Sequence, residues 1–348
     1  MKNSEAILVV PGRMEIKDAP VPEPKENEVM IKVEYVGICG SDVHGFESGP
    51  FIPPKDPNQK IGLGHECAGT VVKVGSRVKK FKPGDRVNIE PGVPCGTCRY
   101  CLEGKYNICP DVDFMATQPN YKGALTNYLC HPEDFTYKLP DNMDTMEGAL
   151  VEPAAVGMHA ALEGGARLGK KIVILGAGCI GLMTLQACRC LGASEIVVVD
   201  VLSKRLEKAK ELGAMEVING MEEDTEKRCK EILGDFGADI VFETAGSMAT
   251  AKTAPNIVAR GGKIMIVGTI SGEVPINFLK INREVTIQTV FRYANNYPMT
   301  IEAISSGKFD VKSMVTHVYD YQDVQRAFEE SVNCKREMIK GVIRISDA

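Results

Sequence analysis

The sequence has no excess of positive charge. Its 41 Lys and Arg residues are outnumbered by 46 Asp and Glu residues, which gives a formal net charge of −5 over 348 residues. A protein that binds nucleic acid mainly through its phosphates needs a surplus of cationic side chains, so we expect no nucleic-acid partner. Apolar residues make up 44% and charged residues 25%, which are ordinary values for a folded protein, and the length favours two domains of roughly 150 residues.

Long hydrophobic runs and repeats are missing too. The longest uncharged stretch of interest, Ile172–Cys188, has 17 residues, which is the lower limit for a membrane-spanning helix, and it contains three glycines. The N-terminal segment Met1–Gly12 includes Glu5 and an apolar run too short for a secretion signal. Neither internal repeats nor heptads are present. We therefore expect no membrane partner and a cytoplasmic, reducing environment.

Twelve cysteines are present, and in a reducing environment they are thiols or metal ligands rather than disulfides. Cys95, Cys98, Cys101 and Cys109 fall within 15 residues with the spacing C-x2-C-x2-C-x7-C. Four thiolates this close can surround one tetrahedral Zn²⁺ in a closed, structural site. The alternatives are an iron–sulfur cluster, which Cys109-Pro110 weakly suggests, and four independent buried cysteines. The polar loop and the missing ferredoxin repeat favour zinc.

The chain changes character along its length. The first 150 residues contain short strands separated by Gly and Pro, such as the alternating segment Val29–Tyr35 and the β-branched run Thr70–Val74, which predicts a barrel-like or sandwich-like domain. From Lys171 onward, short apolar runs alternate with helical patterns, which predicts βαβ units and a parallel sheet. The strands expected there are Ile172–Leu175, Ile196–Val199, Asp239–Phe242 and Lys263–Val267, and the helices are Ile180–Leu191, Ser203–Leu212 and Ser247–Ala259. The elements expected after them are helices over Pro298–Ser306 and Asp320–Glu330 and a strand over Gly341–Ile345 that returns to the first domain.

The motif G-A-G-C-I-G begins at Gly176, between an expected strand and an expected helix. Gly176 permits a tight turn, Gly178 lets the backbone approach a pyrophosphate, and Gly181 lets the helix pack closely on the strand. Asp200 ends the next strand, 24 residues after Gly176, where it can accept hydrogen bonds from an adenosine ribose and repel a 2′-phosphate. The pattern therefore predicts NAD rather than NADP, with a glycine turn that has lost its ligand as the alternative. Arg205 is either close to the adenosine or an exposed helical Arg.

A second group of metal-ligating residue types is dispersed along the chain. Cys39 follows a strand in G-I-C-G-S-D-V-H, His65 and Glu66 stand in G-L-G-H-E-C-A-G, and Glu152 stands in V-E-P. Each residue alone is more often part of the core or solvated. Together, a thiolate, an imidazole and a carboxylate on separate loops are typical of an open zinc site with a position left for water or substrate.

These motifs occur together and in order, joined by I-E-P-G at 89–92, Y-K-L-P-D-N at 137–142 and F-R-Y-A-N at 291–295. Over essentially its whole length the chain resembles the zinc-dependent medium-chain dehydrogenases, and among them the sorbitol (L-iditol) and xylitol dehydrogenase group. The resemblance implies an α/β plus β fold. A GroES-like β-rich catalytic domain would comprise residues 1–155 and 291–348, with a Rossmann NAD-binding domain over residues 156–290. It also implies a homo-oligomer, with a tetramer favoured over a dimer.

The resemblance implies roles for individual residues. Cys39, His65 and Glu66 would hold a catalytic zinc, with water and Glu152 completing its surroundings, and Ser41 and His44 match a proton-relay position. The polyol substrate would be bound by Phe114, Glu152, Arg292 and Tyr293. The cofactor would be contacted by Gly176, Gly178, Ile180, Gly181, Asp200, Arg205, Val267, Gly268, Thr269, Val290, Phe291 and Arg292. One departure is Gly45, which replaces an aromatic residue of the animal enzymes, and another is the four-cysteine loop, which those enzymes lack.

The expected reaction is oxidation of a secondary hydroxyl of a small-molecule polyol to a ketose, with hydride transfer to NAD and two Zn²⁺ per chain, one catalytic and one structural. Within the same chemistry, the substrate could instead be an amino-alcohol such as threonine, a polyol phosphate or a simple secondary alcohol. A nucleotide-sensing or lens-type structural protein is a second alternative, which the four candidate ligands of the catalytic zinc disfavour. A zinc-dependent nucleic-acid binder is a third, which the acidic charge balance disfavours.

Overall fold

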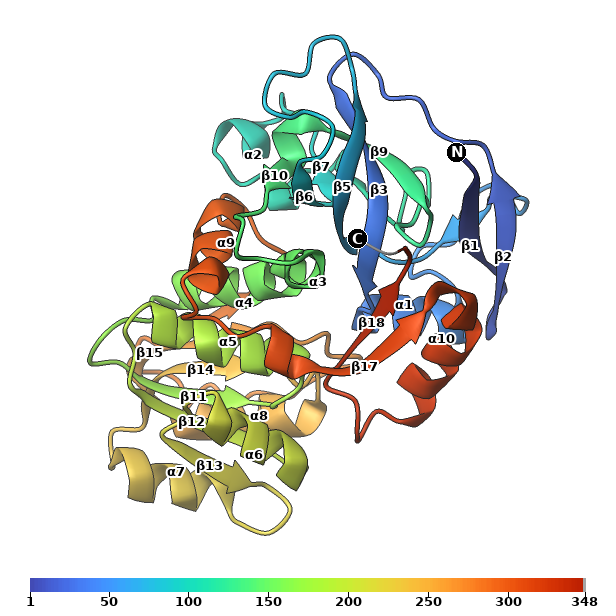
Figure 1. Ribbon diagram of the computed structural model, residues 1–348. Coiled ribbons are helices and arrows are strands. Elements are labelled where there is room, and N and C mark those ends of the chain that lie inside the picture. The colour runs from blue at the N-terminus through green and yellow to red at the C-terminus, as the bar shows by residue number, and fades with distance from the viewer. Residues whose placement is uncertain (347–348) are drawn as a thin grey trace. The chain divides into compact units, whose positions relative to one another are not determined.

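The computed structural model describes residues 1–346, and the chain divides into two compact units (Figure 1). The first unit contains residues up to Glu152, then Tyr297–Ser305, and then the chain from Val311 onward. The second contains Pro153–Asn296 and Ser306–Asp310. The first unit is thus built from both ends of the chain, with most of the second inserted between them. Within the described residues, no helix has the length and apolar character needed to span a membrane.

The first unit is organised around a seven-stranded sheet in the order β10-β6-β5-β3-β18-β17, with β9 also paired to β3. Its strands are β3 (Glu28–Gly37), β5 (Glu66–Val74), β6 (Arg86–Ile89), β9 (Tyr128–Pro132), β10 (Thr136–Lys138), β17 (Val315–Asp320) and β18 (Lys340–Arg344). The C-terminal strand β18, red in Figure 1, pairs antiparallel with the blue strand β3. The prediction that the chain end returns to the first domain is therefore confirmed.

Smaller elements complete this unit. A three-stranded sheet has the order β2-β1-β4, and β7 pairs with β8. These strands are β1 (Asn3–Val10), β2 (Arg13–Ala19), β4 (Ile61–Gly62), β7 (Gly92–Val93) and β8 (Asp113–Phe114). The helices are α1 (Gly40–Ser48), α2 (Arg99–Leu102), α3 (Thr145–Ala149), α9 (Tyr297–Ser305) and α10 (Val324–Asn333), with short 3₁₀ helices η1 (Tyr106–Ile108), η2 (Glu133–Phe135), η3 (Lys312–Met314) and η4 (Tyr321–Asp323).

The second unit contains a six-stranded sheet in the order β13-β12-β11-β14-β15-β16, in which every pairing is parallel. Its strands are β11 (Lys171–Leu175), β12 (Glu195–Asp200), β13 (Glu216–Asn219), β14 (Ala238–Glu243), β15 (Val258–Ile266) and β16 (Thr286–Thr289). The helices are α4 (Val151–Gly164), which begins at the division between the units, α5 (Cys179–Cys190), α6 (Ser203–Glu211), α7 (Thr225–Leu233) and α8 (Met248–Ile257). The strand order reverses direction between β11 and β14, which is where ligands bind in sheets of this kind.

The apolar runs explain why the central strands were evident in the sequence. Ile172, Val173 and Ile174 of β11 are 0% exposed, because a parallel sheet covered on both faces buries every side chain of its inner strands. The sequence analysis missed β13 and β16. Both have four residues, E-V-I-N in β13 and T-I-Q-T in β16, and polar residues flank the apolar ones in each, so neither strand forms an apolar run. The side chains of the edge strand β16 are also mostly exposed.

His131 on β9 allows a test of this fold through the pH dependence of its stability. Its side chain is 4% exposed, Nε2 lies 2.9 Å from the carbonyl oxygen of Glu90, and burial lowers the pKa of the imidazole to about 4. An unfolded His titrates near 6.5, so the unfolded chain binds the extra proton first as the pH falls. The contribution of His131 is therefore complete above about pH 6.5, and about 2 kcal/mol of the free energy of unfolding is lost by pH 5.

We expect His131→Gln, which keeps an N–H donor and cannot titrate, to remove this part of the acid sensitivity. The measurement is chemical denaturation of both proteins at pH 7 and pH 5. Wild type and variant losing equal stability between the two pH values would contradict a neutral, buried His131.

Candidate active site

Three predicted metal ligands from separate segments meet in the first unit. Cys39 is the N-cap of α1, His65 directly precedes β5, and Glu66 is the first residue of β5. Their ligand atoms all lie within 4.8 Å of one another, and His65 and Glu66 are 5% and 1% exposed. A thiolate, an imidazole and a carboxylate are a donor set that Zn²⁺ takes, so the residues fit the metal that the sequence predicted. Glu152, in the first turn of α4, is buried but does not belong to this cluster of described residues.

Asp42 orients this cluster, and the sequence analysis did not single it out. It is 2% exposed in the first turn of α1, where Oδ2 accepts a hydrogen bond from the Cys39 amide (3.1 Å) and Oδ1 accepts one from the Gly64 amide (2.8 Å). Oδ1 also lies 3.5 Å from His65 Nδ1, which leaves Nε2 for a metal. Its spacing of three residues from Cys39, which forms a capping box, was the available signal.

The charges of this cluster shift the pKa values of its members. Burial opposes ionisation of Asp42, but His65 and the two amide donors lower the pKa of its carboxyl below the usual value. Burial likewise opposes the charged form of His65, yet Asp42 and Cys39 raise the pKa of the imidazole well above its usual value. A metal ion bound here must therefore displace protons, because zinc takes a thiolate and a neutral imidazole.

Phe114, a proposed substrate residue, lies beside this cluster in the first unit. Its ring centroid is 5.4 Å from that of His65, and the side chain is 5% exposed. A Cβ on Gly92 would come within 3.0 Å of the Phe114 ring, so a glycine there leaves room for it. Gly45 is also closely packed, because a Cβ there would lie 3.2 Å from Leu63 Cδ2.

The two proposed relay residues lie on α1. Ser41 is exposed, and the half-buried ring of His44 stacks on Phe51 with centroids 3.9 Å apart. Arg292 and Tyr293 belong instead to the second unit, after β16. The Arg292 backbone is left-handed (φ 52°), its guanidinium lies over the Phe291 ring at 4.8 Å, and Tyr293 is 3% exposed.

Glu90 and Glu152 form a second group of buried carboxylates in the first unit. Glu90 follows β6, is 1% exposed and accepts a hydrogen bond from the Tyr137 hydroxyl at 2.9 Å. Burial, with a smaller contribution from the charge of Glu152, raises the pKa of Glu90 to about 7, although hydrogen bonds from Tyr106 and Tyr137 oppose the shift. Sequence analysis had used this residue only as part of a motif.

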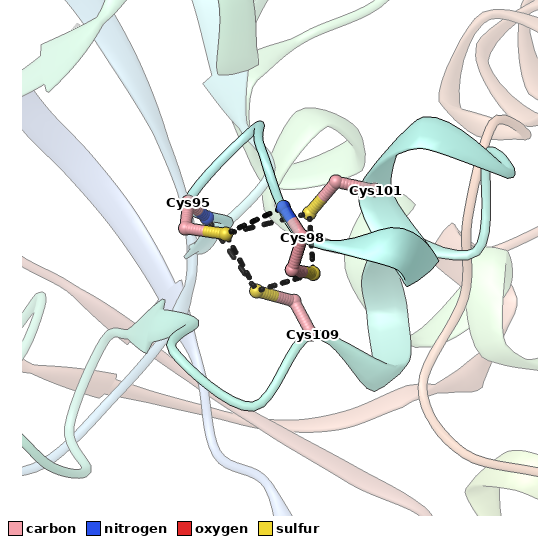
Figure 2. Close-up of side chains that lie close together, drawn as sticks. All are labelled: Cys95, Cys98, Cys101 and Cys109. Atoms are coloured by element: carbon pink, nitrogen blue, oxygen red, sulfur yellow. Dashed lines mark hydrogen bonds between the residues drawn. The ribbon is translucent and has the colours of Figure 1, made fainter.

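The four-cysteine loop brings its thiols together as the spacing predicted (Figure 2). The Sγ atoms are 3.4 Å apart for Cys98–Cys101, 3.6 Å for Cys95–Cys109, 3.8 Å for Cys98–Cys109 and 3.9 Å for Cys95–Cys101. A Zn–S bond of about 2.3 Å implies tetrahedron edges of about 3.8 Å, so the thiols fit one tetrahedral ion. The Cys98 amide donates to Cys95 Sγ at 3.3 Å, and amide donors lower the pKa of the Cys95 thiol to about 6.

The glycine turn of the second unit joins β11 to α5, and two of its three glycines have a steric reason. Gly176 has φ +110°, and a Cβ there would lie 2.8 Å from the Ala245 amide nitrogen. A Cβ on Gly181 would lie 1.8 Å from the Gly176 carbonyl oxygen, so helix and turn pack too closely for any other residue. Gly178 is open instead: among the described residues, a Cβ there would meet Arg205 Nη1 at 3.8 Å, which is an ordinary contact distance. The turn therefore has room for a ligand at the N-terminus of α5.

Asp200, the last residue of β12, points its carboxylate at this turn. Oδ2 accepts a hydrogen bond from the Ala177 amide (2.6 Å), and Oδ1 accepts bonds from the amides of Val201 (2.7 Å) and Leu202 (2.9 Å). The other proposed cofactor residues follow the carboxyl ends of β15 and β16 or lie in the first turn of α5. In a Rossmann domain, dinucleotides bind at this carboxyl end of the parallel strands. These proposed residues are Ile180, Val267, Gly268, Thr269, Val290, Phe291 and Arg292.

Glu243 is a further residue at this edge that the sequence analysis missed. It ends β14, is 0% exposed, and its Oε1 accepts hydrogen bonds from the Ala245 amide (3.1 Å) and the Thr250 hydroxyl (2.7 Å). Its carbonyl oxygen accepts bonds from the amides of Val267 (2.8 Å) and Gly268 (2.9 Å). Glu243 thus accepts hydrogen bonds from the turn that follows β14 and from the turn that follows β15. The signal for it in the sequence was an acidic residue at the end of an apolar run.

Comparison with known proteins is consistent with this geometry. The model of the alcohol dehydrogenase GroES-like domain matches residues 25–141, and the model of the zinc-binding dehydrogenase family matches residues 179–306. A sorbitol dehydrogenase of Bacillus subtilis is 43% identical over 349 residues, which cover 97% of this chain and 96% of that protein.

Two further matches come from Escherichia coli. An uncharacterised zinc-type alcohol dehydrogenase-like protein is 80% identical over 347 residues, which cover 100% of both chains. A crystal structure of an oxidoreductase/dehydrogenase of unknown specificity matches with a TM-score of 0.99 at 80% identity, again over 100% of both chains. The predicted fold, a GroES-like domain with a Rossmann domain, is confirmed. The chain belongs to the zinc-dependent medium-chain dehydrogenases and, within them, resembles the sorbitol dehydrogenases.

Proposed function

We propose that this protein oxidises a secondary hydroxyl of a polyol of the sorbitol, L-iditol or xylitol type to a ketose, with NAD as the hydride acceptor. The observation that carries this proposal is the cluster of Cys39, His65 and Glu66, whose ligand atoms lie within 4.8 Å of one another. The glycine turn at Gly176, with its open position at Gly178, supports a dinucleotide as the cofactor. The 43% identity to a sorbitol dehydrogenase supports a polyol as the substrate class.

The catalytic zinc would be held by Cys39, His65 and Glu66, with Glu152 completing its surroundings, and it would supply a Lewis acid at the substrate hydroxyl. The chain's own residues then have separate tasks. Asp42, 3.5 Å from His65 Nδ1, keeps the imidazole oriented. The ring of Phe114 beside His65 forms an apolar wall that limits access of water to the reacting hydroxyl. Ser41 and His44 on α1 carry the proton toward solvent, a role supported by the exposure of Ser41.

The cofactor supplies the hydride acceptor, and the second unit supplies its binding site. The open face of Gly178 and the N-terminus of α5 receive the pyrophosphate, and Asp200 accepts hydrogen bonds from the adenosine ribose. Arg205, whose Nη1 would lie 3.8 Å from a Cβ on Gly178, would lie beside the adenosine half. The residues that follow β15 and β16 would contact the rest of the cofactor. NAD is favoured over NADP because Asp200 would repel a 2′-phosphate.

Arg292 and Tyr293 hydrogen-bond the hydroxyls next to the reacting carbon. A pocket that buries donors for several hydroxyls rejects simple alcohols strongly, because those donors would be left unpaired. The small residue Gly45, where animal sorbitol dehydrogenases carry an aromatic side chain, changes the shape available to the polyol. We therefore expect Gly45, Arg292 and Tyr293 to determine which polyol this protein prefers.

We also propose a cytoplasmic homo-oligomer, with a tetramer favoured over a dimer. The support within the second unit is the edge strand β16, which among residues 1–346 pairs only with β15. Ile287 on this strand is 39% exposed. An exposed edge with apolar side chains favours pairing with another chain, and a second copy is the simplest partner.

A substrate panel tests the proposed reaction. Formation of NADH is measured with sorbitol, xylitol, galactitol, a polyol phosphate, threonine and 2-propanol, with and without a zinc chelator. We expect a free polyol to give the highest kcat/KM and the chelator to abolish turnover. A polyol phosphate, threonine or 2-propanol as the best substrate would contradict the free-polyol assignment.

Arg292→Ala should weaken the use of the preferred polyol by about 10- to 100-fold in kcat/KM, because a lost hydrogen bond to a charged group costs about 1.5–3 kcal/mol. Use of 2-propanol, which has no neighbouring hydroxyls, should change far less. The two substrates are compared at saturating NAD. An equal loss on both would assign Arg292 to the cofactor or the fold instead of the polyol.

Two zinc ions per chain are expected by elemental analysis. Cys39→Ala or His65→Ala should remove one ion and nearly all activity while the protein stays folded. Cys98→Ser should instead lower the melting temperature and the yield of folded protein, because metal-binding energy at a closed four-thiolate site is folding energy. An unchanged metal content and stability of Cys98→Ser would show that the loop holds no structural zinc.

Asp200→Ala should lower kcat/KM with NAD and raise it with NADP. The carboxylate accepts from the ribose hydroxyls of NAD, and Lys204 and Arg205 are close enough in sequence to assist a 2′-phosphate once it is gone. Both cofactors are assayed at saturating polyol. A wild-type protein that uses NADP as well as NAD, or an unchanged ratio in the variant, would exclude Asp200 as the residue that selects the cofactor.

A further inference from the structure

A buried lysine pairs with one of the proposed zinc ligands. Lys340 is the first residue of β18, and its side chain is 3% exposed. Its Nζ donates to Glu66 Oε1 at 2.7 Å and lies 2.5 Å from Oε2, so it contacts both carboxylate oxygens. A third contact is the carbonyl oxygen of Ile38, which accepts a hydrogen bond from Nζ at 2.9 Å.

The sheet itself holds this ion pair in place. Strand β3 lies between β5 and β18, and its last residue, Gly37, pairs with Glu66 on one side and with Val342 on the other. A Cβ on Gly37 would lie 2.0 Å from Glu66 Oε2, so the carboxylate occupies the space that the missing side chain leaves. The ammonium group and the carboxylate therefore meet at a position set by backbone pairing, in contrast to the flexible ion pairs of a protein surface.

The same carboxylate faces the metal position. An oxygen of Glu66 lies within 4.8 Å of the ligand atoms of Cys39 and His65 while Lys340 contacts both oxygens. A buried carboxylate without a cation is costly, and Lys340 removes that cost when no metal is present. When a metal binds, the ammonium competes for the carboxylate and repels the incoming cation at short range.

We propose that Lys340 is a positioning residue that restrains Glu66 and so makes it an exchangeable ligand of the catalytic zinc. This inference rests on the zinc site of the proposed function. If Lys340 restrains Glu66, it weakens zinc binding at the Cys39 site. Without its metal this site stays folded, because the ammonium of Lys340 balances the charge of the Glu66 carboxylate. The four-cysteine loop differs, because its cations Arg99 and Lys105 pair with Glu103 on the surface of the loop.

The test is the rate at which zinc leaves the protein for a coloured chelator in excess. Two phases are expected, one for each site, and loss of one phase in Cys39→Ala identifies the catalytic one. Lys340→Met keeps the length and apolar stem of the side chain and removes its charge. We expect it to slow the catalytic phase by about 10- to 100-fold, which corresponds to about 1.4–2.8 kcal/mol, and to leave the other phase unchanged.

Two comparisons separate this effect from general damage. Lys335→Met removes a lysine of the same unit whose Nζ lies 3.2 Å from Glu47 on the surface, and it should leave both phases unchanged. In a Glu66→Gln background, adding Lys340→Met should have no further effect on zinc release, because the two residues act as one pair. A structural defect would speed zinc release in every background.

Thermal unfolding gives a second readout. Lys340→Met should lower the melting temperature more in the metal-free protein than in the zinc-loaded protein, because only the former leaves Glu66 without a cation. If Lys340→Met released catalytic zinc at the wild-type rate or faster, Lys340 would not compete for Glu66. A zinc content that does not fall in Cys39→Ala would overturn the proposed catalytic site and this role with it, whereas loss of one zinc in that variant with unchanged release in Lys340→Met would overturn this role alone.

Discussion

The register of strand β3 against its antiparallel neighbours determines the candidate active site of the first unit. Because Gly37 at the end of β3 pairs with Glu66 of β5, the chain that leaves β3 delivers Cys39 next to His65 and Glu66. Pairing with β18 on the other side brings Lys340 to the same carboxylate. A shift of one residue in either ladder would turn these side chains to the opposite face of the sheet. The metal ligands and the buried ammonium thus depend on the same hydrogen-bonded strands.

Buried carboxylates organise both units. An isolated buried charge is costly, so each of these groups constrains the partners that compensate it. Asp42 is compensated by His65 and two amides, Glu66 by Lys340, and Glu243 by one amide of the turn that follows it and one hydroxyl of α8. At Glu90 burial outweighs the tyrosine hydrogen bonds, which raises the pKa to about 7. Polar groups therefore position the candidate zinc ligands and the turns proposed to bind the cofactor, while the apolar core supplies most of the stability.

The two candidate metal sites differ in where their order comes from. The four-cysteine site is made by one short loop, whose amide groups donate to Cys95 Sγ and Cys109 Sγ, so its geometry depends mainly on local turns. The other site gathers ligands from the end of β3 and the start of β5, and it forms only when the sheet does. A closed site contributes its binding energy to folding, whereas a site preorganised by the sheet can exchange its metal while the protein remains folded.

The sequence by itself determined the inner parallel strands of the second unit, the glycine turn and the four-cysteine loop. Each of these is marked by an apolar run or a fixed spacing, which is a property of a short segment. The edge strands β13 and β16 lacked such a run. The tertiary structure alone decided that Asp42 contacts His65, that Glu243 joins two turns and that Lys340 reaches Glu66, 274 residues away. These contacts follow from strand register and packing, in which residues far apart in the chain become neighbours, and no local pattern encodes that proximity.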